Sequence, residues 1–116
     1  MQTKVKTYVP NIEEDVLIRI RKLHDYFLSL VQDAGLLTVT FTELVSKGIY
    51  CEGDGIEAFI SDFKFLVSVV VTLDSDELTY CGSLYIYCEI MEDKRILVFM
   101  NNKYRIRFGL EEVIRL

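Results

Sequence analysis

The chain has 116 residues, of which 51% are hydrophobic and 12% aromatic, and its formal net charge at pH 7 is -5. This length and composition predict a single folded domain over residues 1–116 and exclude a disordered chain. Proteins that coat nucleic acids are basic overall, so an acidic chain can contact DNA only through a restricted patch.

The sequence predicts neither a membrane segment nor a secretion signal. The longest apolar runs, such as residues 65–73, are about half as long as a membrane helix requires. The N-terminal lysines are followed by residues 7–10, which end in a proline and form no apolar region. The three cysteines form neither an even set nor a C-x-x-C pair, as expected for reduced thiols in a cytoplasmic protein.

Residues 1–10 are predicted to form an extended arm, because Pro10 favours an extended conformation in the residue before it. A long helix should follow, with Asn11 as its N-cap, Glu14 completing a capping box and Gly35 ending it. Apolar residues at steps of three or four give this helix one buried face: Leu17, Ile20, Leu23, Phe27, Leu30, Val31 and Ala34.

A short strand and a brief helix are expected next. Apolar and polar residues alternate over residues 37–41, as they do in a strand with one buried face. Thr40 or Thr42 can then cap a helix that Gly48 ends.

A third helix is predicted to begin at a capping box made by Asp54 and Glu57. Its end has two interpretations, because residues 67–73 are rich in β-branched side chains. A strand could begin there, or the helix could continue to about residue 70.

The last third of the chain is predicted to form antiparallel hairpins after a turn at residues 74–76. β-branched and aromatic residues fill the expected strands, and Asp and Asn suit the turns. The strands are residues 84–90, 96–100 and 104–108, the turns are residues 92–94 and 101–102, and residues 110–115 begin like a helix.

The predicted order of elements is a long helix, a strand, two further helices and C-terminal hairpins. This is the order of a winged helix-turn-helix domain, in which two helices form the turn motif and a hairpin forms the wing. We therefore expect an α+β fold that is winged-helix-like.

Four segments combine hydrophobic spacing with a few polar residues: Phe27-x-x-Leu30, Thr38-Val39-Thr40-Phe41-x-Glu43-Leu44, Phe59-Ile60-x-Asp62-Phe63-Lys64-x-Leu66 and Val98-Phe99-Met100-Asn101-Asn102-Lys103-Tyr104. With these segments, residues 27–108 resemble the N-terminal winged-helix domain of Rep-type plasmid replication initiators. In that family this domain takes part in dimerisation and in DNA contact, so the resemblance implies a role in plasmid or phage replication initiation or in DNA-linked regulation. The chain departs from the family in being acidic and in containing no second winged-helix domain.

The candidate nucleic-acid-binding residues lie in the last hairpins. Between residues 94 and 107 the chain has five basic residues and no acidic one: Lys94, Arg95, Lys103, Arg105 and Arg107. On a wing, such side chains could contact the phosphate backbone. Alternatively, the hairpin is a solvated sheet face whose arginines pair with Glu89, Glu92 or Glu111.

The candidate protein-binding residues lie in the acidic part of the chain and in the tyrosine-rich strand. Residues 43–93 contain eleven acidic and two basic residues. A base-reading helix would carry Arg, Lys, Asn or Gln, so the carboxylates of the third helix suit a protein partner better. We expect a homodimer through the sheet or the first helix. The candidates are Asp54, Glu57, Asp62, Tyr85 and Tyr87, the last two on one strand face.

No catalytic or metal-binding signature is present. His24 is the only histidine, and neither Cys81 nor Cys88 lies at a zinc-ligand spacing. We therefore predict no enzymatic activity, cofactor, metal or small-molecule substrate. The first interpretation is a binding module that acts through dimerisation and a basic wing. The alternative is a small acidic phage or mobile-element protein that binds and inhibits a host protein of the nucleic-acid-handling machinery.

Overall fold

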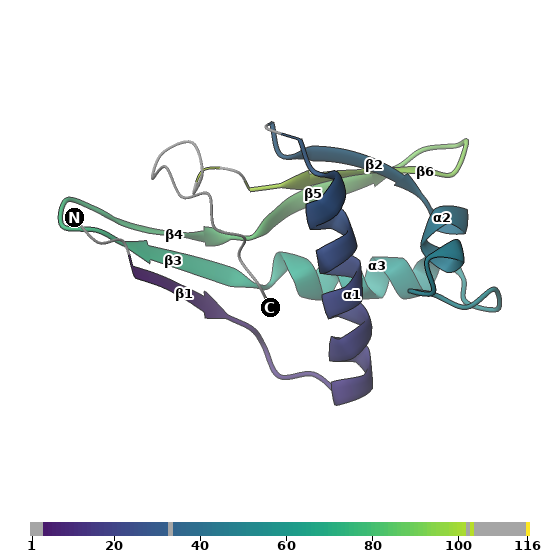
Figure 1. The fold of residues 1–116 in the computed structure, drawn as a ribbon, viewed down its shortest axis with the longest axis horizontal. Coiled ribbons are helices and arrows are strands. Elements are labelled where there is room, and N and C mark those ends of the chain that lie inside the picture. The colour runs from purple at the N-terminus through teal and green to yellow at the C-terminus, as the bar shows by residue number, and fades with distance from the viewer. Residues whose placement is uncertain (1–3, 33, 102, 104–115) are drawn as a thin grey trace.

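A computed structural model describes residues 4–32, 34–101, 103 and 116 of the chain. Its fold is α+β, with two three-stranded antiparallel sheets in the orders β1-β3-β4 and β2-β6-β5 (Figure 1). The elements are β1 (Lys4–Tyr8), α1 (Glu14–Leu30), β2 (Leu36–Thr40), α2 (Phe41–Ser46), α3 (Ile56–Val67), β3 (Val70–Asp74), β4 (Thr79–Ser83), β5 (Tyr85–Ile90) and β6 (Arg95–Met100).

The predicted long helix is present as α1, but both of its ends differ from the prediction. The capping box of Asn11 and Glu14 is wrong, because Glu13 is the N-cap and its carbonyl accepts the N–H of Leu17 at 3.0 Å. The helix ends at Leu30 and not at Gly35. Gly35 instead has a φ of 82° and its carbonyl accepts the N–H of Met100 at 2.7 Å, so pairing with β6 requires the chain to turn early.

The short second helix is confirmed with its cap. The Thr40 hydroxyl accepts the N–H of Glu43 at 3.1 Å, and Gly48, just after the helix, has a φ of 76°. The third helix is also confirmed, but its predicted capping box is wrong. Gly55 is the N-cap, since the Asp54 carboxylate accepts the N–H of Cys51 at 2.8 Å instead of capping α3.

The uncertain end of the third helix resolves as a helix followed by a strand. Helix α3 ends at Val67, and β3 begins at Val70. Strand β3 pairs with β4 and with the N-terminal strand β1, so the predicted extended arm is part of a sheet. This sheet projects from the body of the molecule (Figure 1). Its pairing joins residues more than sixty positions apart, such as Tyr8 and Val70, and was not predicted.

Strands β5 and β6 confirm the predicted hairpin with its turn at residues 92–94. Only Leu84 separates β4 from β5, so one stretch of chain passes from the first sheet into the second. The predicted strand at residues 104–108 and helix at residues 110–115 lie outside the described residues.

The core lies between the helices and the inner face of the β2-β6-β5 sheet (Figure 1). Its largest fully buried side chains include Tyr85 from β5, Phe27 from α1 and Phe59 from α3. The rings of Phe27 and Tyr85 have centroids 6.1 Å apart, and those of Phe27 and Phe59 are 6.4 Å apart. Burial of such large apolar groups is the main source of stability for a chain of this size.

A bidentate ion pair joins α1 to α3. The Nε and Nη2 atoms of Arg19 each donate to one Asp62 oxygen at 2.7 Å, and the hydroxyl of Tyr50 donates to Oδ2 at 2.6 Å. The Asp62 side chain is 2% exposed and that of Arg19 is 33% exposed. Hydrogen bonding to Asp62 raises the pKa of Arg19, and burial followed by the bond to Asp62 raises the pKa of Tyr50. The carboxylate is therefore satisfied within the fold.

We predict that Arg19→Met lowers the free energy of unfolding by about 2–4 kcal/mol, because a buried carboxylate would lose its charge partner while part of the effect is screened by solvent at Arg19. Urea denaturation followed by circular dichroism measures this. The matched control is Arg21→Met, which removes an exposed arginine from the same helix. Equal losses in the two variants would show that the ion pair does not stabilise the fold.

Candidate interaction surfaces

The β2-β6-β5 sheet has a second face, the outer face, which the described helices do not cover. Figure 1 shows α3 beneath this sheet, on the side of the core. The register places Leu36, Phe99 and Tyr87 in one row across the three strands. The rings of Tyr87 and Phe99 stack with centroids 4.6 Å apart, and Tyr87 is 42% exposed. The outer face therefore presents a row of apolar and aromatic groups to solvent.

Tyr85 does not share a face with Tyr87, so this prediction is wrong. A β-bulge lies between them, since Tyr85 pairs with Met100 and Tyr87 pairs with the next residue, Phe99. The extra residue, Ile86, reverses the alternation of side chains along β5. Tyr85 is fully buried and is unavailable to a partner.

The buried Tyr85 is hydrogen-bonded to the only histidine. The Tyr85 hydroxyl lies 2.6 Å from Nδ1 of His24, which is itself fully buried on α1. Such a bond removes the cost of burying two polar groups in an apolar core. His24 therefore has a structural place in the core.

The turn between β5 and β6 carries the first two candidate DNA contacts. Lys94 is exposed, with a φ of 71°. Arg95 is paired, since its Nε donates to Asp93 at 2.6 Å, and both side chains are more than half exposed. The N–H of Arg95 and then its side chain lower the pKa of Asp93. Arg95 thus has a carboxylate partner, although a different one from the three expected.

The remaining predicted basic residues are only partly described. Lys103 is exposed, and its N–H donates to the side chain of Asn101 at 3.1 Å. Arg105 and Arg107 lie outside the described residues. Of the basic candidates, Lys94 and Lys103 are therefore the described side chains that have no ion pair.

The acidic candidates lie in different environments. Glu57 is exposed on the first turn of α3, and Asp54 is half-buried just before that helix. Asp62 was expected on the same surface, but it is buried against Arg19 and Tyr50. This expectation is wrong because Asp62 lies on the face of α3 that packs against α1. Asp62 lies three residues after Phe59 and four before Leu66, on the apolar face of the helix, and this spacing could have suggested an internal partner.

The described residues give no support for a metal centre. No group of three His, Cys, Asp or Glu side chains among them could hold a metal ion. Cys51 and Cys81 are exposed, and burial raises the pKa of the half-buried Cys88. No helix in the described part of the chain is long and apolar enough to cross a membrane.

Comparison with known proteins adds no relative. No protein-family model matches the chain, and neither a curated protein nor a solved structure has significant similarity to it.

We predict that Lys94→Gly raises the free energy of unfolding by about 0.5–1 kcal/mol, because glycine adopts a positive φ without steric cost. The measurement is urea denaturation. Lys94→Ala is the control, since it removes the charge but keeps the β-carbon and should not stabilise the fold. An equal gain in both variants would assign the effect to charge and contradict the backbone explanation.

Proposed function

We propose that this chain is a non-enzymatic, winged-helix-like binding module that forms a homodimer through the outer face of its β2-β6-β5 sheet. The observation that carries this proposal is the apolar row of Leu36, Phe99 and Tyr87 on the outer face, in which Tyr87 is exposed and the other two are half-buried. A contiguous apolar patch on a small soluble domain is typical of an interaction site. Aromatic residues are enriched in such interfaces because they bury a large area with few rotatable bonds.

The charge of the outer face supports a second copy as the partner. The chain as a whole has a net charge of -5, so two copies repel each other at long range. On the outer face, however, Glu89 lies in the row of Leu97 and Thr38, and Arg95 lies beside Thr40. Arg95 is already paired with Asp93, so Glu89 is the charged side chain of these rows that has no ion pair among the described residues. Repulsion between two copies is therefore small where the apolar row lies.

The strand order supports the winged-helix-like arrangement. The strand that follows the first helix, β2, pairs with β6, and β5 and β6 form a hairpin after α3. In this arrangement α2 and α3 would be the helix pair, and the β5-β6 hairpin would be the wing. The β1-β3-β4 sheet is an addition, and the nine residues 47–55 between α2 and α3 exceed the usual turn of about 3–4 residues.

DNA contact through the wing is a second candidate function. Lys94 favours it, because an exposed lysine at the tip of the hairpin lies where a wing meets the phosphate backbone. The neighbouring charges weaken it, because Arg95 is paired with Asp93 and the exposed N-terminal turn of α3 carries Glu57. Any such contact would be weak, independent of base sequence and sensitive to salt.

We predict that the wild-type chain sediments at twice its mass of 13.5 kDa, and that Tyr87→Glu raises the dimer dissociation constant by about 30-fold or more. A charge placed in the aromatic row would lose its hydration when two faces meet. Analytical ultracentrifugation over a concentration series measures both quantities.

The matched control for this prediction is Ile18→Glu. Ile18 is 45% exposed, close to the exposed fraction of Tyr87, but it belongs to α1 and not to the outer face of the sheet. Circular dichroism confirms that both variants are folded. A wild-type chain that is monomeric at its highest soluble concentration would rule out the dimer, and equal weakening by both variants would place the interface elsewhere.

For DNA contact, we predict weak binding to a random duplex at low ionic strength that falls steeply as salt rises. In a plot of the logarithm of affinity against the logarithm of salt concentration, Lys94→Gln should make the negative slope less steep by about 1. Fluorescence anisotropy of a labelled duplex gives this slope, and the control is Lys22→Gln, which removes an exposed lysine from α1. Absence of binding at the lowest salt would eliminate this candidate.

A further inference from the structure

A groove lies at the end of the molecule opposite the projecting arm, where the β5-β6 turn faces the first residues of α2 and α3. Its volume is about 570 Å³, within the range of about 300–1,000 Å³ typical of binding pockets. Apolar side chains form much of its lining: Phe41 from α2, Ile56 from α3, and Ile90 and Met91 from the hairpin. Ile90 is 41% exposed although it pairs with the buried Ile96 on the inner face of the sheet. An apolar surface thus remains open at this point.

The rim of the groove is acidic. Asp54 and Glu92 line it from two sides, and the carboxylate of Glu57 lies against the lining residue Gly55. Lys94 is the only basic side chain among the described residues of the lining. Three carboxylates against one ammonium group leave a negative potential around an apolar floor. A phosphate backbone would be repelled here, whereas a cationic group would be attracted.

We infer that this groove binds a protein segment in which an apolar side chain is flanked by arginine or lysine residues. The apolar anchor would occupy the floor beside Ile56 and Ile90, and the basic neighbours would meet Asp54 and Glu92 at the rim. Charge complementarity selects this occupant over DNA and over a second copy of the same acidic groove. The inference does not depend on the outer face, because different residues form the two surfaces.

The carboxylates can receive such a partner without disturbing the fold. Asp54 uses Oδ2 to accept the N–H of Cys51, and among the described residues its Oδ1 remains available to a ligand. Glu92 is exposed, and no ion pair of the described residues includes it. Lys94 lines the same groove, where its charge would oppose a basic ligand. Its removal should therefore strengthen peptide binding but weaken DNA binding.

The test is a selection with the wild-type chain from a random twelve-residue peptide library. We expect enriched peptides to combine an aromatic or branched aliphatic residue with at least two basic residues. Fluorescence anisotropy of the best labelled peptide then compares variants. Ile90→Gln should weaken binding by about tenfold or more, because anchor contacts dominate such sites. Ile86→Gln is its matched control, since Ile86 is 54% exposed on the same strand but does not line the groove.

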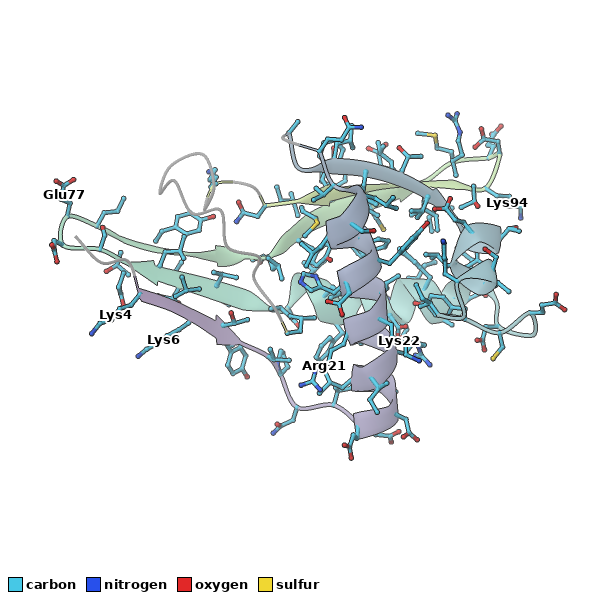
Figure 2. All side chains as sticks on the ribbon, viewed as in Figure 1. Lys4, Lys6, Arg21, Lys22, Glu77 and Lys94 are labelled. Atoms are coloured by element: carbon cyan, nitrogen blue, oxygen red, sulfur yellow. The ribbon has the colours of Figure 1, made fainter. Side chains whose placement is uncertain are left out.

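The electrostatic part has its own variants. Asp54→Asn with Glu92→Gln keeps an acceptor for Cys51 and should weaken binding by about 2- to 30-fold, the range expected for two exposed charge pairs. Glu77→Gln should have no effect, because Glu77 lies at the tip of the arm, far from Lys94 (Figure 2). Lys94→Gln should tighten peptide binding.

Several outcomes would overturn the inference. The selection could enrich no peptide, or it could enrich acidic peptides. Alternatively, Ile86→Gln could weaken peptide binding as much as Ile90→Gln does. Loss of self-association in Ile90→Gln with no peptide bound would assign the groove to a second copy. If the chain binds the duplex and Ile90→Gln abolishes this binding, the groove would be assigned to DNA. None of these results depends on whether Tyr87→Glu disrupts a dimer, so the two proposals fail separately.

Discussion

One extra residue in β5 determines which side chains lie on each face of the second sheet. Because Ile86 has no partner on β6, the residues before and after it point to opposite faces. Tyr85 enters the core and packs against Phe27, while Tyr87 stacks on Phe99 outside. A regular strand would place both tyrosines on one face, and either the core or the surface would lose its aromatic group. The bulge therefore places one tyrosine in the core and the other on the outer face.

A second constraint concerns where the negative charge lies. The formal net charge of -5 counts every acidic residue, but not all of these residues lie on the surface. The carboxylate of Asp62 is inside, where Arg19 neutralises it. The pair also fixes α3 against α1, and replacing one partner alone would leave a buried charge. Some of the acids that remain outside lie near the start of α3 and at the β5-β6 turn, as Glu57 and Glu92 illustrate. Charge and apolar surface meet there, which makes that end of the molecule suited to a basic partner.

Structural features that depend on residues close together in the sequence could be predicted from the sequence. The Thr40 cap and the turn at residues 92–94 follow from local chemistry and are present. Both capping boxes failed because the polar side chains found other roles, as Asp54 did with Cys51. The β1-β3 pairing and the bulge depend on contacts distant in sequence, which periodicity cannot reveal.

Among the candidate site residues, Tyr87 was placed correctly on the surface, whereas Tyr85 and Asp62 belong to the interior. Several residues behind the initiator resemblance are also core positions, including Phe27, Phe59, Leu66 and Val98, so their spacing reports packing more than function.

The two proposed surfaces share one physical origin. After the bulge, the side chains of β5 alternate regularly, so Tyr87 and Glu89 face outward and Ile90 faces inward. Ile90 is the last residue of the edge strand β5, where it is 41% exposed in spite of its inward position, and it therefore lines a groove. A second copy on the outer face would contact the opposite side of the same hairpin and leave that groove open. A register that moved Tyr87 inward would also turn Ile90 outward, so the outer face and the groove depend on the same bulge.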